Sequence, residues 1–279
     1  MGESCTKIEE ETFELKNFIE NFDPDYNIER REKDKYSNIF IDKKIKAQEL
    51  NYDDGSKYSG ECVNGKREGF GCQVWKDGTR YIGEWKEDKA NGRGKLIQMD
   101  GFISIGEFRD NKLNGEGRRI YPDGSSIEGR FLEDEFVRKG IKRWPNGAKY
   151  DGQFVDDKMH GFGVFEWPNG SRYQGYWDNN KMHGEGTYHL PDKRIYKGNF
   201  LENEMSGQGV MIWPDGKKYE GDFLNGKCDG FGKMVKRDGT IYEGNWKNGK
   251  QHGKGELIKG NKKKVGLWQN GKFFRTIEN

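Results

Sequence analysis

The sequence has few of the apolar residues from which a thick hydrophobic core is built. Only 32% of its 279 residues are apolar and 34% are charged, which argues against an ordinary multilayered globule. No apolar run approaches the length of a membrane-spanning helix, and the first residues lack the apolar stretch of a secretory signal. The four cysteines show no Cys-x-x-Cys spacing, so we expect an intracellular protein with reduced thiols.

Aromatic residues and glycine are abundant instead, and they indicate a folded chain. Aromatic residues make up 14% of the sequence and glycine occurs 41 times, whereas disordered chains are poor in aromatic residues. The net charge of +2 is unevenly distributed. Residues 1–50 hold 9 basic and 13 acidic side chains, whereas residues 247–275 hold nine basic side chains and one acidic one. A thin folded layer with a charge imbalance near each end is therefore predicted.

A tyrosine-glycine-aromatic triplet recurs every 23 residues. Repetition at a fixed period sets the architecture before any local pattern does. A chain built from one small unit offers a long surface more readily than a single reaction centre. The central glycines of the triplets, the last after a step of 22, are Gly60, Gly83, Gly106, Gly129, Gly152, Gly175, Gly198, Gly221, Gly244 and Gly266.

Each copy is predicted to be a β-hairpin. Tyr173, Gly175 and Trp177 alternate along the chain and so share one face of a strand. A turn such as Asn225-Gly226 leads to a second strand with Gly-x-Gly, and Pro-Asn-Gly or Pro-Asp-Gly turns join the copies. The fold class is therefore mainly β, an elongated single-layer antiparallel β-meander of tandem 23-residue hairpin repeats. Residues 1–50 are expected to be an N-terminal extension that is partly helical and partly disordered, and residues 51–275 are expected to form the repeat array.

The glycines are expected to allow this single layer to bury its rings. They lie on the aromatic face, where the missing side chain lets a neighbouring ring lie flat across the backbone. The opposite face is rich in Glu, Lys, Asp, Asn and Gln, and we expect it to be solvated.

These residues resemble the MORN repeat, which combines Tyr-x-Gly-x-Trp/Phe, an Asn-Gly-Lys turn, His/Asn-Gly-x-Gly and a closing Pro-Asp/Asn-Gly. Residues 219–223 and 242–255 match this pattern well, and the resemblance covers about residues 52–272. It implies a non-enzymatic scaffold of cytoskeletal, ciliary (for example radial-spoke-like) or cortical membrane assemblies. Enzymes of the family carry a separate catalytic domain, for which residues 1–50 leave no room. We therefore expect no catalytic residues and no cofactor.

Some copies depart from the pattern. Cys62 replaces the second aromatic residue of the first copy. Ser104 and Ser126 stand near the tyrosine positions of the third and fourth copies, and Arg138 replaces the first glycine of a Gly-x-Gly. We expect residues 104–140 to be looser, kinked or adapted to a partner.

The N-terminal extension carries two further patterns. Thr6 and Glu9 have capping-box spacing. An apolar stripe at helical spacing follows: Leu15, Phe18, Ile19 and Phe22. This helix either packs on the sheet or docks a partner. The start of the chain fits N-myristoylation of Gly2 and palmitoylation of Cys5, two chains that together hold a membrane stably. The alternative is a coincidence at an ordinary initiator methionine.

The aromatic face is predicted to form a groove that binds a protein partner as an extended or helical segment. The array also allows the protein to form a homo-oligomer, and we expect no nucleic-acid partner. The three histidines His160, His183 and His252 share one repeat position, and a repeat spacing of about 10 Å is too wide for a shared zinc ion. The predicted groove residues are Tyr150, Phe154, Tyr173, Trp177, Tyr196, Phe200, Tyr219, Phe223, Tyr242 and Trp246.

A basic patch without acidic neighbours is predicted near the C-terminal end. It either attaches the protein to an acidic partner or anionic lipid, or it is a solubilising cap of the last strand. Together with acylation of Gly2 and Cys5 it supports an alternative function, a membrane or phosphoinositide-binding adaptor. We expect the protein in the cytoplasm, at the cytoskeleton or cilium, or on the cytoplasmic face of a membrane. The patch residues are Lys259, Lys262, Lys263, Lys264, Lys272 and Arg275.

Overall fold

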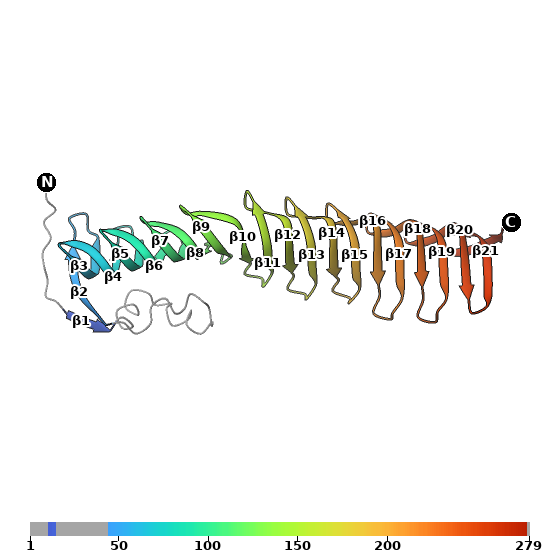
Figure 1. Cartoon of the computed structure of the whole chain (residues 1–279), viewed down its shortest axis with the longest axis horizontal. Coiled ribbons are helices and arrows are strands. Elements are labelled where there is room, and N and C mark those ends of the chain that lie inside the picture. Colours follow the sequence, from blue (N-terminus) through green and yellow to red (C-terminus); the bar gives the residue numbers. More distant parts are fainter. Residues whose placement is uncertain (1–10, 15–43, 278–279) are drawn as a thin grey trace. The chain divides into compact units, whose positions relative to one another are not determined.

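A computed structural model describes residues 11–14 and 44–277 (Figure 1). Contacts divide the chain into two compact units, unit 1 (Met1–Pro145) and unit 2 (Asn146–Asn279). All regular structure in the described residues is β-strand. The capping box Thr6–Glu9 and the apolar stripe Leu15–Phe22 of the predicted helix lie outside them, as do the predicted acylation sites Gly2 and Cys5, whereas Glu11–Glu14 between the two patterns form a strand.

The described residues of unit 1 form ten strands. They are β1 (Glu11–Glu14), β2 (Lys44–Asn51), β3 (Lys57–Val63), β4 (Lys66–Val74), β5 (Arg80–Lys86), β6 (Lys89–Ile97), β7 (Ile103–Arg109), β8 (Lys112–Ile120), β9 (Ser126–Leu132) and β10 (Glu135–Arg143). Each strand pairs antiparallel with the next one in the chain. The repeat pattern predicts β3 to β10, whereas β1 and β2 are additions that it does not predict.

In unit 2, the part of the chain that the structure describes forms twelve strands. They are β11 (Lys149–Val155), β12 (Lys158–Glu166), β13 (Arg172–Asp178), β14 (Lys181–His189), β15 (Ile195–Leu201), β16 (Glu204–Ile212), β17 (Lys218–Leu224), β18 (Lys227–Val235), β19 (Ile241–Lys247), β20 (Lys250–Lys259), β21 (Lys262–Gln269) and β22 (Lys272–Thr276). Here too each strand pairs antiparallel with the next. The prediction of a mainly β meander of tandem hairpins is confirmed.

The hairpin turns require positive φ at both central residues, as the Asn-Gly copies predict. Asn225 and Gly226 have φ of 49° and 73°. The same turn also forms without glycine at Glu202 (49°) and Asn203 (74°). Asn and Asp tolerate this region better than other side chains, and bonds to the preceding repeat support it further.

Those bonds form a rung between successive repeats at the hairpin turns. The Asn203 Oδ1 accepts a hydrogen bond from the Met182 N–H at 2.8 Å, and the Asn203 N–H donates to the Met182 carbonyl at 3.0 Å. The same pair of bonds recurs at Asp88, Asn111, Asp134 and Asn180. The side chain at the second turn position therefore stabilises the strained turn and ties one repeat to the one before it.

A line of paired glycines crosses the strands of each unit, and the tyrosine rings lie on it. Gly175 pairs with Gly186, and the Tyr173 ring lies across both. A Cβ added at Gly175 would stand 2.5 Å from the Tyr173 hydroxyl oxygen, and one added at Gly186 would stand 2.5 Å from Cε2 of that ring. The Tyr173 hydroxyl donates to the Tyr176 carbonyl at 3.0 Å. No residue larger than glycine fits beneath the ring.

The rings continue from repeat to repeat as an edge-to-face ladder. The Tyr173 ring contacts Trp177 of its own strand at a centroid distance of 5.1 Å and Phe200 of the next repeat at 5.0 Å. The Tyr196 ring contacts Phe200 at 5.1 Å and Phe223 at 4.9 Å. We call this side of each unit the tyrosine face and the opposite side the outer face. The core of each unit is this ladder.

The copies that depart from the pattern fill the ladder differently. Ser104, at a tyrosine position, is buried, and the Arg119 Nε approaches its hydroxyl at 3.4 Å while the guanidinium lies 5.2 Å from the Phe131 ring centroid. Arg138 has a φ of 49° at a position that is glycine in the other copies, and the pairing of β9 with β10 shifts register between Phe136 and Gly140. The other hairpins show the same register shift, and Gly161 at the equivalent position of the next copy has a φ of 60°, so a looser, kinked or partner-adapted segment at residues 104–140 stays a prediction.

Replacing Gly186 by alanine should destabilise the protein by about 1–3 kcal/mol, because the new methyl group overlaps the Tyr173 ring. Chemical denaturation followed by circular dichroism measures the effect. Glu185→Ala, on the same strand but exposed on the outer face, is the control and should change stability by less than about 0.5 kcal/mol. Equal effects of the two substitutions would contradict the ring-on-glycine contact as the basis of the fold.

Candidate protein-binding surfaces

The ten aromatic residues predicted to form a binding groove lie in the interior of unit 2. Tyr150, Tyr173, Tyr196 and the other seven are between 0 and 7% exposed. Their burial assigns these side chains to packing, so as they stand they do not form an open groove. A role in partner binding stays a prediction for them, and an accessible surface has to be formed by other residues.

The buried tyrosines are held in the neutral state. Burial raises the pKa of the Tyr242 phenol to about 12, and it also raises the pKa values of Tyr173 and Tyr196. The Tyr242 hydroxyl donates to the Asn245 carbonyl at 3.0 Å. These phenols therefore act as hydrogen-bond donors inside the sheet and not as reactive groups.

The outer face of unit 2 carries large aromatic side chains that reach solvent. Phe162 in β12 and Tyr176 in β13 are directly paired, are 46% and 52% exposed, and make an edge-to-face contact at 5.7 Å. They border a hollow of about 670 Å³ whose floor includes Gln174, Thr187 and Val210. The sequence does place Tyr176 on this face by alternation. What it does not reveal is that Phe162, at a position usually polar in other copies, lies beside it.

Charges on this outer face are largely paired. Lys218 binds Glu220 at 2.7 Å and Lys233 lies 3.4 Å from Glu243. The His160 Nδ1 lies 3.4 Å from an Asp178 carboxylate oxygen. The charged residues that line the hollow beside Phe162 and Tyr176 are of both signs, Arg172, Lys197 and Glu185.

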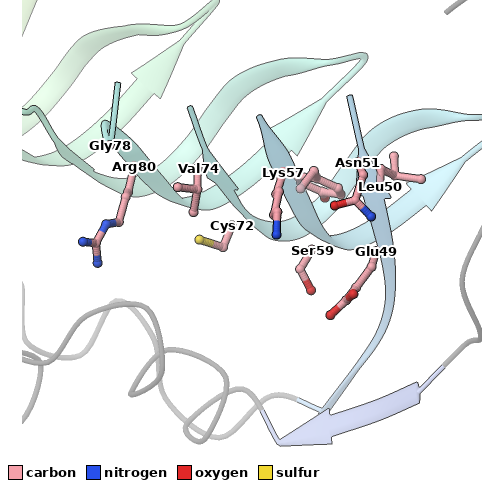
Figure 2. Close-up of a pocket in the computed structure, with 10 residues that line it drawn as sticks. Glu49, Leu50, Asn51, Lys57, Ser59, Cys72, Val74, Gly78 and Arg80 are labelled. Atoms are coloured by element: carbon pink, nitrogen blue, oxygen red, sulfur yellow. The ribbon is translucent and has the colours of Figure 1, made fainter. Parts of the chain in front are cut away.

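The outer face of unit 1 differs in both composition and burial. One cross-strand row there contains Ser59, Cys72, Ile82, Lys95 and Ile105, all of them buried. A second hollow of about 430 Å³ lies at its N-terminal end, lined by residues of β2 to β5. Figure 2 shows Glu49, Ser59 and Arg80 pointing to the same side of the sheet.

The predicted basic patch lies on the last three strands of unit 2, and two of its members have partners. The Lys263 Nζ binds a Glu256 carboxylate oxygen at 2.7 Å, and the Lys264 Nζ lies 3.5 Å from the Phe273 ring centroid. The expectation that no acidic side chain neighbours these lysines is therefore wrong. It missed Glu256 because β20 and β21 are antiparallel neighbours, which brings the two side chains together.

Within the described residues, no group of three or more His, Cys, Asp or Glu side chains is arranged to hold a metal ion. Over the same residues, no helix is long and apolar enough to cross a membrane.

A search with family models matches the MORN repeat nine times along the chain. The matched segments are residues 58–80, 81–101, 105–126, 128–149, 150–172, 173–193, 196–218, 219–241 and 242–263. The chain belongs to the MORN repeat family. The MORN repeats span both units and account for strands β3 to β20 and the start of β21.

No curated protein matches this MORN-repeat chain, and the solved structures similar to it are distant. The SAS-4 (dCPAP) TCP domain of Drosophila melanogaster, in complex with a proline-rich motif of Ana2, is 14% identical with a TM-score of 0.38, covering 60% of this chain and 90% of that one. The TCP10 domain of Danio rerio CPAP, in complex with a STIL peptide, is 14% identical with a TM-score of 0.30, covering 84% and 95%. Likeness of this degree carries no argument about function.

Alkaline pH should unfold the MORN array through its buried tyrosines. Their contribution to stability is complete below pH about 10, where an unfolded tyrosine is also neutral. It is lost as the pH rises toward about 12, the folded-state pKa of Tyr242. We expect tyrosinate absorbance and loss of the sheet signal in circular dichroism to follow the same steep transition. Gradual appearance of all the tyrosinates with the sheet intact would contradict burial of the rings.

Proposed function

We propose that this protein is a non-enzymatic MORN-repeat scaffold that binds a protein segment across the outer face of unit 2. Proteins built from MORN repeats are typically scaffolds or binding modules without catalytic activity. The setting we propose is a cytoplasmic assembly of the cytoskeleton, the cilium or the cell cortex. The observation that carries the proposal is the exposed, paired rings of Phe162 and Tyr176 beside a hollow on this face.

Exposed aromatic pairs are costly to leave in water and are typical anchors of binding surfaces. The two rings stand edge to face, so an apolar side chain of a partner contacts one ring by its face and the other by its edge. Each ring is bordered on one side by the other ring, because the pairing of β12 with β13 fixes the distance between the two residues. Such preorganisation lowers the entropy cost of binding.

The floor of the hollow favours an extended segment of low net charge as the partner. Gln174 offers an amide group, and Thr187 offers a hydroxyl. An extended backbone has unpaired N–H and C=O groups that these side chains can satisfy, whereas a helix satisfies its own. The paired charges nearby, such as Lys218 with Glu220, give no reason for a strongly charged partner.

Replacing both Phe162 and Tyr176 by alanine should weaken capture of the partner segment by at least about tenfold, since anchor residues contribute about 2 kcal/mol or more each. Affinity purification with quantitative mass spectrometry identifies the segment, and calorimetry with the corresponding peptide measures the loss. Thermal unfolding should change little, because both side chains project from the outer face.

The matched control is Met99→Ala with Leu132→Ala, two exposed apolar side chains of unit 1. The control protein should retain the partner. If both double variants bind equally well, the outer face of unit 2 is not the interface, and the buried tyrosine face has to be tested by partner-induced opening.

A membrane-binding adaptor is the second candidate, and one observation favours it. Phe274 on the last strand is 64% exposed and stands between Lys272 and Arg275. An exposed ring beside basic side chains suits the interface of an anionic membrane, where the ring enters the headgroup region and the charges meet phosphate groups. Acylation of Gly2 and Cys5 would add a second, separate anchor.

Replacing Lys259, Lys262 and Lys272 by glutamine should weaken binding to vesicles that contain phosphatidylserine and a phosphoinositide. At about 1 kcal/mol per basic residue, three changes correspond to about a hundredfold. Wild-type binding should also fall as salt is raised. The control triple variant replaces Lys89, Lys112 and Lys181, which bind Asp110, Glu133 and Glu202 within the array. If vesicle binding changes neither with salt nor in either triple variant, the patch is only a solubilising cap.

A further inference from the structure

We infer that the outer face of unit 1 is the docking surface of the chain's own segment between β1 and β2, residues 15–43. This segment lies outside the described residues, so the inference is drawn from the surface it would cover, from the two strands that tether it and from its sequence. It concerns a different surface from the proposed partner site on unit 2 and does not depend on that site.

The first observation is the contrast between equivalent positions in the two units. Ile82 follows the tyrosine of its repeat and is 0% exposed, whereas Gln174 occupies the same position in unit 2 and is exposed. Ile105 is 4% exposed, whereas its counterpart Lys197 is exposed. The strands and their pairing are the same in both places. On the outer face of unit 1 these positions are therefore apolar, and their side chains are buried. A single-layered sheet buries side chains on its outer face only where a further segment packs against them.

The second observation is where the tether begins and ends. Glu14 at the end of β1 pairs with Lys44 at the start of β2, so both ends of the joining segment meet at one place. Only the second half of β2, from Gln48 to Asn51, pairs with β3. The first half diverges and carries β1, and Figure 2 shows β1 on the side to which Ser59 and Glu49 point. The segment is thus anchored at both ends beside the face that needs a cover.

The third observation is complementarity of chemistry. The segment begins with the apolar stripe Leu15, Phe18, Ile19 and Phe22, which suits a surface formed by Cys72, Ile82 and Ile105. The apolar stripe of the segment and the apolar residues of this row are therefore complementary.

The thiol of Cys72 provides a direct test, because it lies on this face between Ser59 and Ile82 and is 1% exposed. The test uses the full chain with Cys5→Ser and Cys62→Ser, which leaves Cys72 and, in unit 2, Cys228. Maleimide labelling is followed at each thiol by mass spectrometry. Phe18→Asp with Ile19→Asp should raise the labelling rate of Cys72 by on the order of tenfold or more, because local opening controls access to a buried group. The rate at Cys228 should stay unchanged.

The matched control is Asn17→Asp with Asn21→Asp, which adds the same charge to the same segment without removing an apolar side chain. It should leave the labelling of Cys72 as in the parent. An unchanged rate in Phe18→Asp with Ile19→Asp, or an equal rise in the asparagine control, would overturn the inference.

Faster labelling of both Cys72 and Cys228 would show that the first variant unfolds. A reciprocal variant then tests the same contact from the other side. Ile82→Gln with Ile105→Gln gives unit 1 the polar character of unit 2, whose sheet forms with polar residues at these positions. Hydrogen exchange of residues 15–22 should then accelerate by on the order of tenfold or more, while exchange in β11 to β20 stays unchanged. Exchange of residues 15–22 that is equally fast before and after the change would show that they do not dock on this face.

Discussion

The fold depends on one contact, a tyrosine ring lying flat on two paired glycines. At Tyr173 the ring covers Gly175 and Gly186, and its hydroxyl satisfies the Tyr176 carbonyl. This contact explains how a chain with only 32% apolar residues forms a core. The ring is buried against its own backbone, so no second layer has to be built. It also explains the regular spacing, because each tyrosine needs a glycine in its own strand and another directly opposite.

Much of this architecture could be predicted because its determinants are local and repeated. The Tyr-x-Gly alternation defines the strands, and Asn-Gly pairs such as Asn225 and Gly226 define the turns. The accessibility of the tyrosine face could not be predicted in the same way. Alternation assigns Tyr196 and Phe200 to the tyrosine face, but it does not predict how closely successive rings pack against each other. The centroid distances near 5 Å bury residues that the pattern alone presents as a groove. The strands β1 and β2 could not be predicted, because their residues do not follow the repeat pattern.

The two units show how the same backbone supports two different surfaces. The residue that follows each tyrosine points to the outer face, and nothing in the hairpin geometry restricts its type. Isoleucine at 82 and 105 yields a face that is buried, whereas Gln174 and Lys197 yield one that is solvated. The character of the outer face is therefore determined by positions that the repeat leaves free. A comparison of the invariant positions alone would miss it.

The rungs between hairpin turns have a mechanical consequence. Each repeat is bonded only to its neighbours, through strand pairing and through contacts such as those between Asn203 and Met182. Hydrogen bonds between antiparallel strands point across the strands, so a pull in that direction within one unit loads successive ladders in series. The weakest ladder opens first and releases the length of one hairpin while the remaining repeats keep their contacts. A single layer of this design therefore unfolds in steps and re-forms from the repeats that are still folded.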